Sequence, residues 1–197
     1  MFKLGYAARR LGGACDTQHD RLKLILPYYL QNTMQYRRHY HQGASYFFTI
    51  NLADRSSDLL IKEIETLRNA FKTVKQKHPF HIDAIVILPD HLHMLCTMPN
   101  DDAHYSKRIK LIKYYFSYHI AKTERISKSR QKKGERGIWQ RRFWEHCIRD
   151  ELDYRTHIDY IHMNPVKHGY VERVQDWQYS LFHKFVAEGL LPVNWSD

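Results

Sequence analysis

Residues 81–98, HIDAIVILPDHLHMLCTM, contain two short apolar runs on either side of a Pro89-Asp90 pair. The first run, residues 81–88, is typical of a buried strand, and the Pro-Asp pair is a turn signal. The second run, residues 91–98, predicts another strand, paired antiparallel with the first across the short turn. The stretch therefore predicts a β-hairpin near the middle of the chain.

Strand and helix patterns alternate on both sides of this hairpin. Aromatic and β-branched residues indicate strands, and apolar residues at steps of three and four indicate helices. The predicted elements are residues 45–52 (strand, after a turn at Gly43), 59–78 (helix, capped by Ser57), 106–121 (helix), 138–148 (strand) and a helix from residue 150 that Pro165 should end or kink. The order β-α-β-β-α-β-α predicts an α+β fold, a ferredoxin-like antiparallel sheet with helices packed on it.

The first 33 residues differ from the rest. They contain Gly12-Gly13, mixed polarity and no clean periodicity. A chain of 197 residues suits one domain, or one domain with an arm. We therefore expect an N-terminal extension over residues 1–33 and a single domain over 34–197. Two interpretations of the extension stay open: a native, flexible arm, or an artefactual segment ahead of a natural start at Met34.

Composition excludes several classes of protein. There is no run of about 20 apolar residues, so no membrane-spanning helix is expected, and the N-terminus makes a poor signal peptide. Three cysteines without a CxxC pair favour neither a disulfide framework nor a cysteine-only zinc site, so we expect a cytoplasmic protein. The 31 Lys+Arg against 21 Asp+Glu give a charge of +10, which indicates a polyanionic partner, nucleic acid before membrane. Residues 122–142 hold +7 of this charge and residues 1–33 hold +3.

Two constellations carry chemistry. His91 and His93 are separated by Leu92, so on a strand both imidazoles face one side and can share a divalent ion. The ordinary alternative is a pair of solvated or hydrogen-bonded histidines. Tyr160 and Asn164 lie one turn apart on a helix face, where a tyrosine is commonly an amphipathic rim residue and an asparagine before proline a turn residue.

A third stretch, residues 139–146, alternates aromatic and basic side chains. Such strips bind single-stranded nucleic acid through base stacking and phosphate pairing. We expect the tryptophans in it to be core residues and the arginines to contact phosphate.

Three runs together resemble one family: AIVILPDHLHMLCTMP (84–99), GERGIWQRRFWEHCIRDE (134–151) and HIDYIHMNPVKHG (157–169). They resemble the REP-associated tyrosine transposases, which belong to the single-tyrosine HUH (His-hydrophobic-His) group, and the likeness extends over residues 36–195. The resemblance implies a DNA endonuclease and strand transferase. It assigns His91 and His93 to the HUH pair, Tyr160 to the nucleophile and Asn164 to the third metal ligand.

The resemblance also implies partners and a cofactor. Mg²⁺ or Mn²⁺ suits a mixed nitrogen and oxygen ligand set, and attack by the tyrosine on a palindromic-repeat hairpin of single-stranded DNA gives a 5′-phosphotyrosine. No Walker-type GK[ST] occurs, so no nucleotide cofactor is expected, and the chain is expected to act as a monomer or homodimer, at the nucleoid when bound to DNA. Asp90 is expected to orient a histidine, while His146 and His157 are reserve candidates for the metal or for proton transfer. The predicted DNA contacts are Arg37, Arg38, Lys128, Arg130, Lys132, Lys133, Arg136, Arg141 and Arg142.

Two other functions remain as alternatives. One is a non-catalytic DNA-binding regulator that uses the same fold and basic surface. The other is a zinc hydrolase built on His91, His93 and a third histidine, which the missing HExxH helix disfavours.

Overall fold

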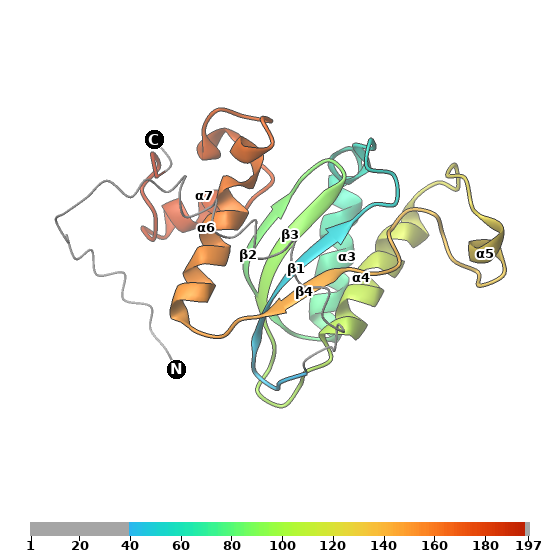
Figure 1. Ribbon diagram of the computed structural model, residues 1–197, viewed down its shortest axis with the longest axis horizontal. Helices are drawn as coiled ribbons and strands as arrows, with labels where there is room; N and C mark the ends of the chain where they lie inside the picture. Colours follow the sequence, from blue (N-terminus) through green and yellow to red (C-terminus); the bar gives the residue numbers. More distant parts are fainter. Residues whose placement is uncertain (1–39, 196–197) are drawn as a thin grey trace, which may run out of the picture. The chain divides into compact units, whose positions relative to one another are not determined.

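The computed structural model describes residues 40–195; the predicted extension 1–33, Arg37 and Arg38 lie outside that range. Four strands form one antiparallel sheet in the order β2-β3-β1-β4 (Figure 1). They are β1 (Ser45–Asn51), β2 (His81–Ile87), β3 (His91–Thr97) and β4 (Trp144–Cys147). This arrangement confirms the predicted α+β class, including the hairpin between β2 and β3.

Helices cover both faces of the sheet. The helices in chain order are α2 (Leu59–Lys62), α3 (Ile64–Lys77), α4 (Tyr105–His119), α5 (Lys128–Gln131), α6 (Glu151–Lys167), the 3-10 helix η1 (Val174–Asp176) and α7 (Phe182–Ala187). α3 and α4 pack side by side on one face, and α6 covers the other (Figure 1).

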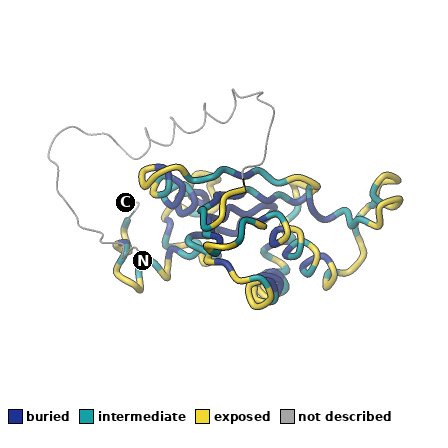
Figure 2. Tube along the Cα trace, turned by 90° about the horizontal axis from the view of Figure 1, so that it is seen from below, coloured by how far each residue is buried: buried dark blue, intermediate teal, exposed yellow. Residues whose placement is uncertain are grey.

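The alternation of side chains along β1 divides the core into two layers. Tyr46, Phe48 and Ile50 pack against α3 and α4. Phe47 points the opposite way, toward apolar residues of α6 such as Ile158. The buried stretches in Figure 2 accordingly run through the sheet, while exposed stretches lie in loops and on the outer sides of helices.

The helix predicted over residues 59–78 is in fact two helices. α2 ends at Lys62 and α3 begins at Ile64, because the backbone of Glu63 leaves the helical region with φ −110° and ψ 33°. The N-cap of α2 is Asp58 and not the predicted Ser57. Ser57, one residue earlier, still accepts a hydrogen bond from the Leu59 amide at 3.2 Å. The apolar spacing continues across the break and therefore did not reveal it.

The predicted fourth strand is also shorter than residues 138–148. β4 covers only Trp144–Cys147, while Trp139 forms an isolated bridge to Leu52. Between them Phe143 turns into the core beside Phe48, which interrupts the pairing.

Pro165 does not end the last predicted helix. α6 continues through it to Lys167. Proline removes its own amide donor and clashes with the preceding turn. The helix nevertheless ends only two residues after the proline, with His168 as its C-cap.

The C-terminal segment covers the edge of the sheet at β2. The Ile87 amide donates to the Tyr179 carbonyl at 2.8 Å, and the Trp177 indole donates to the Ile87 carbonyl at 3.0 Å. These bonds satisfy edge groups that would otherwise be open to pairing with another chain. Within residues 40–195, no helix is long and apolar enough to span a membrane.

Candidate functional site

β3 begins with the two predicted histidines, and both face α6. His91 and His93 are 3% and 4% exposed, and their ring centroids lie 5.0 Å apart, nearly perpendicular. Leu92 between them points to the opposite face and packs in the core with α3 and α4. In the sheet register the histidines lie opposite Asn51 and Thr49 of β1. The structure thus brings the predicted pair together at one end of the sheet.

Each imidazole is held through its Nδ1 atom. Thr49 Oγ1 lies 2.9 Å from Nδ1 of His93, and Asp90 Oδ1 lies 2.7 Å from Nδ1 of His91. Contacts of this kind fix the tautomer and ring orientation of a histidine ligand and leave Nε2 for the ion. Asp90 therefore lies where an orienting residue should, against His91. Thr49 provides the equivalent contact for His93, and the sequence analysis missed it.

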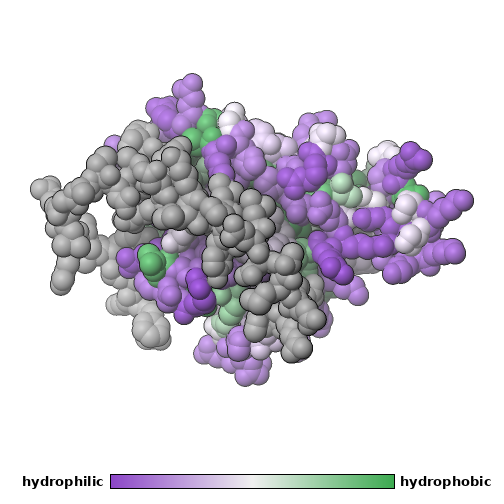
Figure 3. Space-filling view, in the orientation of Figure 1, coloured by the Kyte–Doolittle hydropathy of each residue, from purple (hydrophilic) through white to green (hydrophobic). Residues whose placement is uncertain are grey.

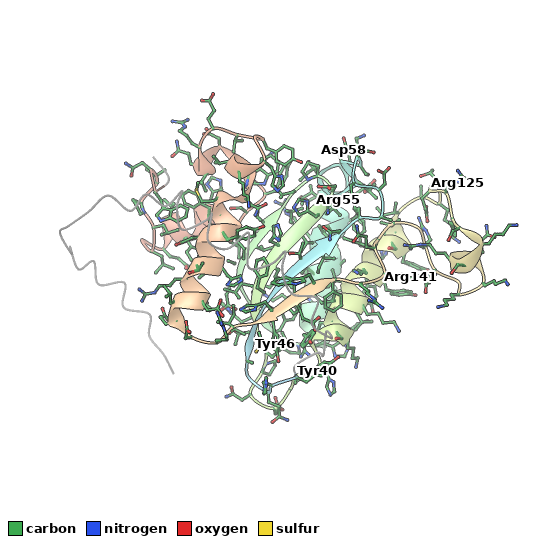
Figure 4. The ribbon with its side chains drawn as sticks, in the orientation of Figure 1. Tyr40, Tyr46, Arg55, Asp58, Arg125 and Arg141 are labelled. Carbon is green, nitrogen blue, oxygen red and sulfur yellow. The ribbon has the colours of Figure 1, made fainter. Side chains whose placement is uncertain are left out.

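Arg55 anchors Asp90 from the other side. Its Nε atom lies 2.5 Å from Asp90 Oδ2, and it also donates to Asn51 Oδ1. Asp90 is 6% exposed, so this pair balances the buried carboxylate charge. Figure 4 shows Arg55 beside the end of β1 where the histidines lie. No sequence signal marks Arg55, because it lies in a loop and in none of the motif runs.

α6 places Tyr160 against His93 of the same chain. The two ring centroids lie 5.2 Å apart at 73°. Phe47 contacts both rings, with centroids 5.5 Å from His93 and 5.8 Å from Tyr160. Tyr160 and His93, 67 residues apart in the sequence, thus belong to one cluster of aromatic contacts.

Asn164 lies one helical turn beyond Tyr160 and is fully buried. Its Nδ2 donates to the Tyr160 carbonyl at 3.4 Å, whereas its Oδ1 has no hydrogen-bond partner among the described residues. An unsatisfied buried acceptor of this kind costs about 1–3 kcal/mol. An amide oxygen without a hydrogen-bond partner can serve, together with imidazole nitrogens, as a ligand of a divalent cation.

Burial controls the protonation of these groups. It lowers the pKa of His91, against an opposing hydrogen bond from Asp90, and it lowers the pKa of His93 much further. Both rings are therefore neutral at pH 7, the form that ligates a metal. Burial raises the pKa of Tyr160, and a hydrogen bond with Asn164 partly opposes that rise.

Two further residues of α6 and its end join the site. The ring centroid of His168 lies 5.3 Å from that of His91, and Nζ of Lys167 lies 5.0 Å from the centroid of the Tyr160 ring. His168 was not among the predicted site residues. The spacing of Tyr160, Asn164 and His168 at i, i+4 and i+8 was a signal that could have placed it on the same helix face.

Three of the four predicted DNA-binding arginines of residues 122–142 have partners within the protein. Arg136 donates to three main-chain carbonyls around the end of α4 and pairs with Glu124. Arg130 donates to two carbonyls of the following segment at 2.6 and 2.9 Å. Arg141 pairs with Glu135 at 2.6 Å. Arg130 and Arg136 thus shape the segment itself.

The remaining predicted cations of this segment point to solvent. Four side chains are exposed and form no hydrogen bond or ion pair within residues 40–195: those of Lys128, Lys132, Lys133 and Arg142. Figure 3 shows hydrophilic side chains gathered at the end of the molecule that carries α5. These four side chains are the ones that remain available for phosphate.

The reserve metal candidates lie apart from the HUH pair. His146 and His157 meet at Asp153, with His146 Nε2 2.7 Å from one carboxylate oxygen and His157 Nδ1 3.1 Å from the other. The Phe47 ring contacts both His157 and His93. The two histidine groups are therefore separate clusters that share one aromatic neighbour.

Comparison with known proteins identifies a family whose matched region includes the histidine pair, Tyr160 and Asn164. Residues 35–164 match the family described as Transposase IS200 like. The REP-associated tyrosine transposase of Escherichia coli K12 is 45% identical over 162 residues, covering 82% of this chain and 90% of that protein. A Haemophilus influenzae protein assigned to the REP-associated tyrosine transposases is 49% identical over 161 residues, covering 81% and 92%. A solved REP-associated tyrosine transposase bound to a REP hairpin matches with a TM-score of 0.72 and 44% identity, covering 84% of this chain and 92% of that one.

Proposed function

The chain belongs to the IS200-like transposases, within the REP-associated tyrosine transposases, and from that premise we propose that it cleaves and rejoins single-stranded DNA at hairpins formed by palindromic repeats. Tyr160 is the nucleophile, and His91, His93 and Asn164 hold a divalent ion, Mg²⁺ or Mn²⁺. The observation that carries the proposal is the contact between the Tyr160 and His93 rings, with centroids 5.2 Å apart. A DNA substrate implies action at the nucleoid.

The proposed reaction needs no external energy source. The Tyr160 oxygen attacks the phosphorus of a phosphodiester, and the bond from phosphorus to the 3′ oxygen breaks. The phenol loses a proton and the 3′ oxygen gains one, so the products are a 5′-phosphotyrosine and a free 3′-OH. Because the covalent bond retains the phosphodiester energy, a second 3′-OH reverses the attack and joins strands without ATP.

The surrounding residues prepare the site for this attack. A bound divalent ion would withdraw charge from the phosphate and stabilise the developing negative charge. Thr49 and Asp90 hold the two imidazoles with Nε2 open, and Asn164 contributes an oxygen. Lys167, with Nζ 5.0 Å from the centroid of the Tyr160 ring, adds positive charge beside the nucleophile.

The exposed cations beyond α4 supply the DNA contact. A solved relative is bound to a REP hairpin. We therefore propose a DNA hairpin as the substrate of this chain. Lys128, Lys132, Lys133 and Arg142 are solvent-facing, and phosphate contacts from such side chains dominate affinity for nucleic acid. Arg130 and Arg136 act indirectly, since they hold the segment that presents the lysines.

A covalent adduct tests the proposed nucleophile. Purified protein is incubated with Mn²⁺ and a hairpin oligonucleotide labelled at its 3′ end, and the adduct is resolved on a denaturing gel. We expect wild type to yield a labelled protein band and Tyr160→Phe to yield none, because only the phenol oxygen is removed. Tyr114→Phe, an exposed tyrosine on α4, is the matched control and should form adduct normally.

Each outcome has a clear meaning. Equal adduct from Tyr160→Phe and wild type contradicts the assignment of the nucleophile. Hairpin binding without adduct or cleavage under any divalent ion, and insensitive to chelator, identifies a DNA-binding regulator instead.

A further inference from the structure

The His146, Asp153 and His157 cluster lies outside the proposed active site and joins two elements. His146 comes from β4, whereas Asp153 and His157 lie in the first turns of α6. One ligand atom from each residue lies within 4.8 Å of the others. Asp153 is 9% exposed and His157 4%, while His146 is half-buried. The cluster is thus a buried group of metal-ligand side chains with one member open to solvent.

The spacing of the donor atoms suits a small divalent ion. Bonds of 2.0–2.1 Å in a tetrahedral zinc site place neighbouring ligand atoms about 3.3 Å apart. The measured separations from the Asp153 carboxylate are 2.7 Å to His146 Nε2 and 3.1 Å to His157 Nδ1. The two nitrogens contact different carboxylate oxygens, and reaching that spacing requires an outward movement of about 0.6 Å for His146 and about 0.2 Å for His157. Because the two rings are stacked at 16°, one of them must also turn so that both nitrogens point to a shared ion.

The protonation states also suit a cation. Burial would raise the pKa of Asp153, but hydrogen bonds from His146 and Arg149 outweigh it and hold the pKa below its ordinary value. Burial lowers the pKa of His157. A carboxylate and neutral imidazole are the forms that ligate a metal. Two nitrogen donors with one oxygen favour zinc-type ions over magnesium.

Existing contacts compete with an ion and limit its affinity. Arg149 Nε lies 3.1 Å from Asp153 Oδ2, but the Arg149 side chain is 63% exposed and can move into solvent. His157 Nδ1 also lies 2.7 Å from the Asp153 main-chain oxygen, so a proton held there must move to Nε2, a change of tautomer, before Nδ1 can bind an ion.

We propose that His146, Asp153 and His157 form a second metal site, which takes a Zn²⁺-class ion and ties β4 to the start of α6. Three protein ligands leave one tetrahedral position for water. Because α6 carries Tyr160, an ion here would stabilise the helix that presents the nucleophile. The site is independent of the proposed DNA chemistry, since none of its residues belongs to the His91, His93 and Asn164 set.

The test removes the first site so that only the second can bind. The full-length His91→Ala/His93→Ala variant, free of metal, is titrated with Co²⁺ and followed by visible absorption, then with Zn²⁺ in competition. We expect about one equivalent of Co²⁺ to bind and Zn²⁺ to displace it, with a rise in melting temperature. Mg²⁺ should not displace it, because that ion prefers oxygen ligands.

Further substitutions in this background assign the ligands. His146→Ala should abolish binding, and Asp153→Asn should weaken it at least tenfold. His81→Ala is the matched control, because His81 Nδ1 also contacts an aspartate, at 2.9 Å, but lies exposed on β2. Circular dichroism of each metal-free variant reports whether it folds. If Asp153→Asn does not fold, His146→Ala still tests the site, because His146 is only half-buried.

Two results overturn the proposal. One is no Co²⁺ binding by the folded His91→Ala/His93→Ala variant. The other is binding that His146→Ala leaves unchanged, which would place the ion elsewhere. Because all readouts are taken without DNA, they are separate from the adduct assay, and either proposal can fail while the other stands.

Discussion

At the scale of single residues, Asn164 is unusual, because its Oδ1 atom is buried and has no hydrogen-bond partner among residues 40–195. An unsatisfied buried acceptor costs about 1–3 kcal/mol, and a bound ligand can remove that cost. As the proposed metal ligand, the residue would contribute less to the stability of the fold than to the site. Tyr160 follows a related pattern, since burial raises the pKa of its phenol and so opposes formation of the nucleophilic phenolate.

Asn164→Ala is therefore expected to separate stability from metal binding. Removing the side chain breaks the weak Nδ2 contact to the Tyr160 carbonyl and the hydrogen bond with the Tyr160 side chain. It also removes an Oδ1 atom that is buried and unpaired among the described residues, so the melting temperature of the metal-free protein should change little. The Mn²⁺ concentration for half-maximal adduct should rise at least tenfold, the low end of the effect seen around metal sites. Asn164→Asp keeps an oxygen ligand and should recover most of the affinity. A large loss of metal-free stability with unchanged Mn²⁺ dependence would contradict this role.

Both ring nitrogens of His162 are buried and have no hydrogen-bond partner among the described residues. Burial among the rings of Phe182 and Phe185 lowers its pKa from 6.5 to about 4. In the unfolded chain the His162 ring therefore binds a proton below about pH 6.5, whereas in the folded chain it stays neutral down to about pH 4. Stability is unaffected above that window and falls as pH decreases through it.

His162→Leu should flatten this dependence. Between pH 7.5 and 5, the wild-type His162 contributes a loss of about 2 kcal/mol, from roughly 1.4 kcal/mol per pH unit. Over the same pH interval, the free energy of unfolding of the leucine variant, measured in urea, should fall by about 2 kcal/mol less than that of wild type. His183→Leu, an exposed neighbour, is the control and should retain the wild-type slope. Equal slopes for His162→Leu and wild type would show that the ring does not resist protonation.

At the scale of elements, hydrophobic periodicity predicted which side chains share a face of a strand or helix. It did not predict where an element is interrupted by side-chain packing. The alternation in residues 91–98 placed His91 and His93 on one face and Leu92 on the other, as observed. Nothing in the same local pattern marks the break at Glu63 or the end of β4 pairing, because both depend on how distant elements pack.

In the basic segment, residues 122–142, the charge can be read from the local sequence, but the partners of the arginines cannot. Its charge was evident from composition, but the separation of Arg130, Arg136 and Arg141 from the exposed lysines depends on which carbonyls and carboxylates lie nearby. Long-range partners such as the carbonyls at the end of α4 leave no trace in a sequence window. The sequence therefore predicts a basic segment, but it does not predict the partners of the individual arginines.

Lys132→Ala/Lys133→Ala should weaken hairpin binding without reducing stability. Each phosphate contact contributes about one unit to the slope of log affinity against log salt, so the slope should become shallower by up to about two. Lys72→Ala/Lys75→Ala removes the same charge from the exposed side of α3 and is the matched control. Fluorescence anisotropy across a salt series measures both. An equal change in the two variants would mean that only net charge matters.

At the scale of the whole molecule, the sheet and α6 bring together residues that no sequence window contains. Thr49, Asp90 and Tyr160 come from three separate parts of the chain and meet around the histidines. The motif runs predicted the histidine pair, the tyrosine and the asparagine. They could not predict Thr49, Arg55 or the ring contact between His168 and His91, because those depend on strand register and on where α6 ends.

The contact between Tyr160 and His93 within one chain predicts an active site that is complete in a monomer. A mixture of His93→Ala, which retains the tyrosine, and Tyr160→Phe, which retains the histidines, should therefore form no adduct, even after co-refolding to allow subunit exchange. Wild type mixed with Tyr160→Phe should give adduct in proportion to the wild-type share. Adduct from the first mixture would instead require a dimer in which α6 of one subunit serves the histidines of the other. In that case, light scattering should show a dimer under the assay conditions, whereas a complete site in each chain leaves activity per molecule independent of protein concentration.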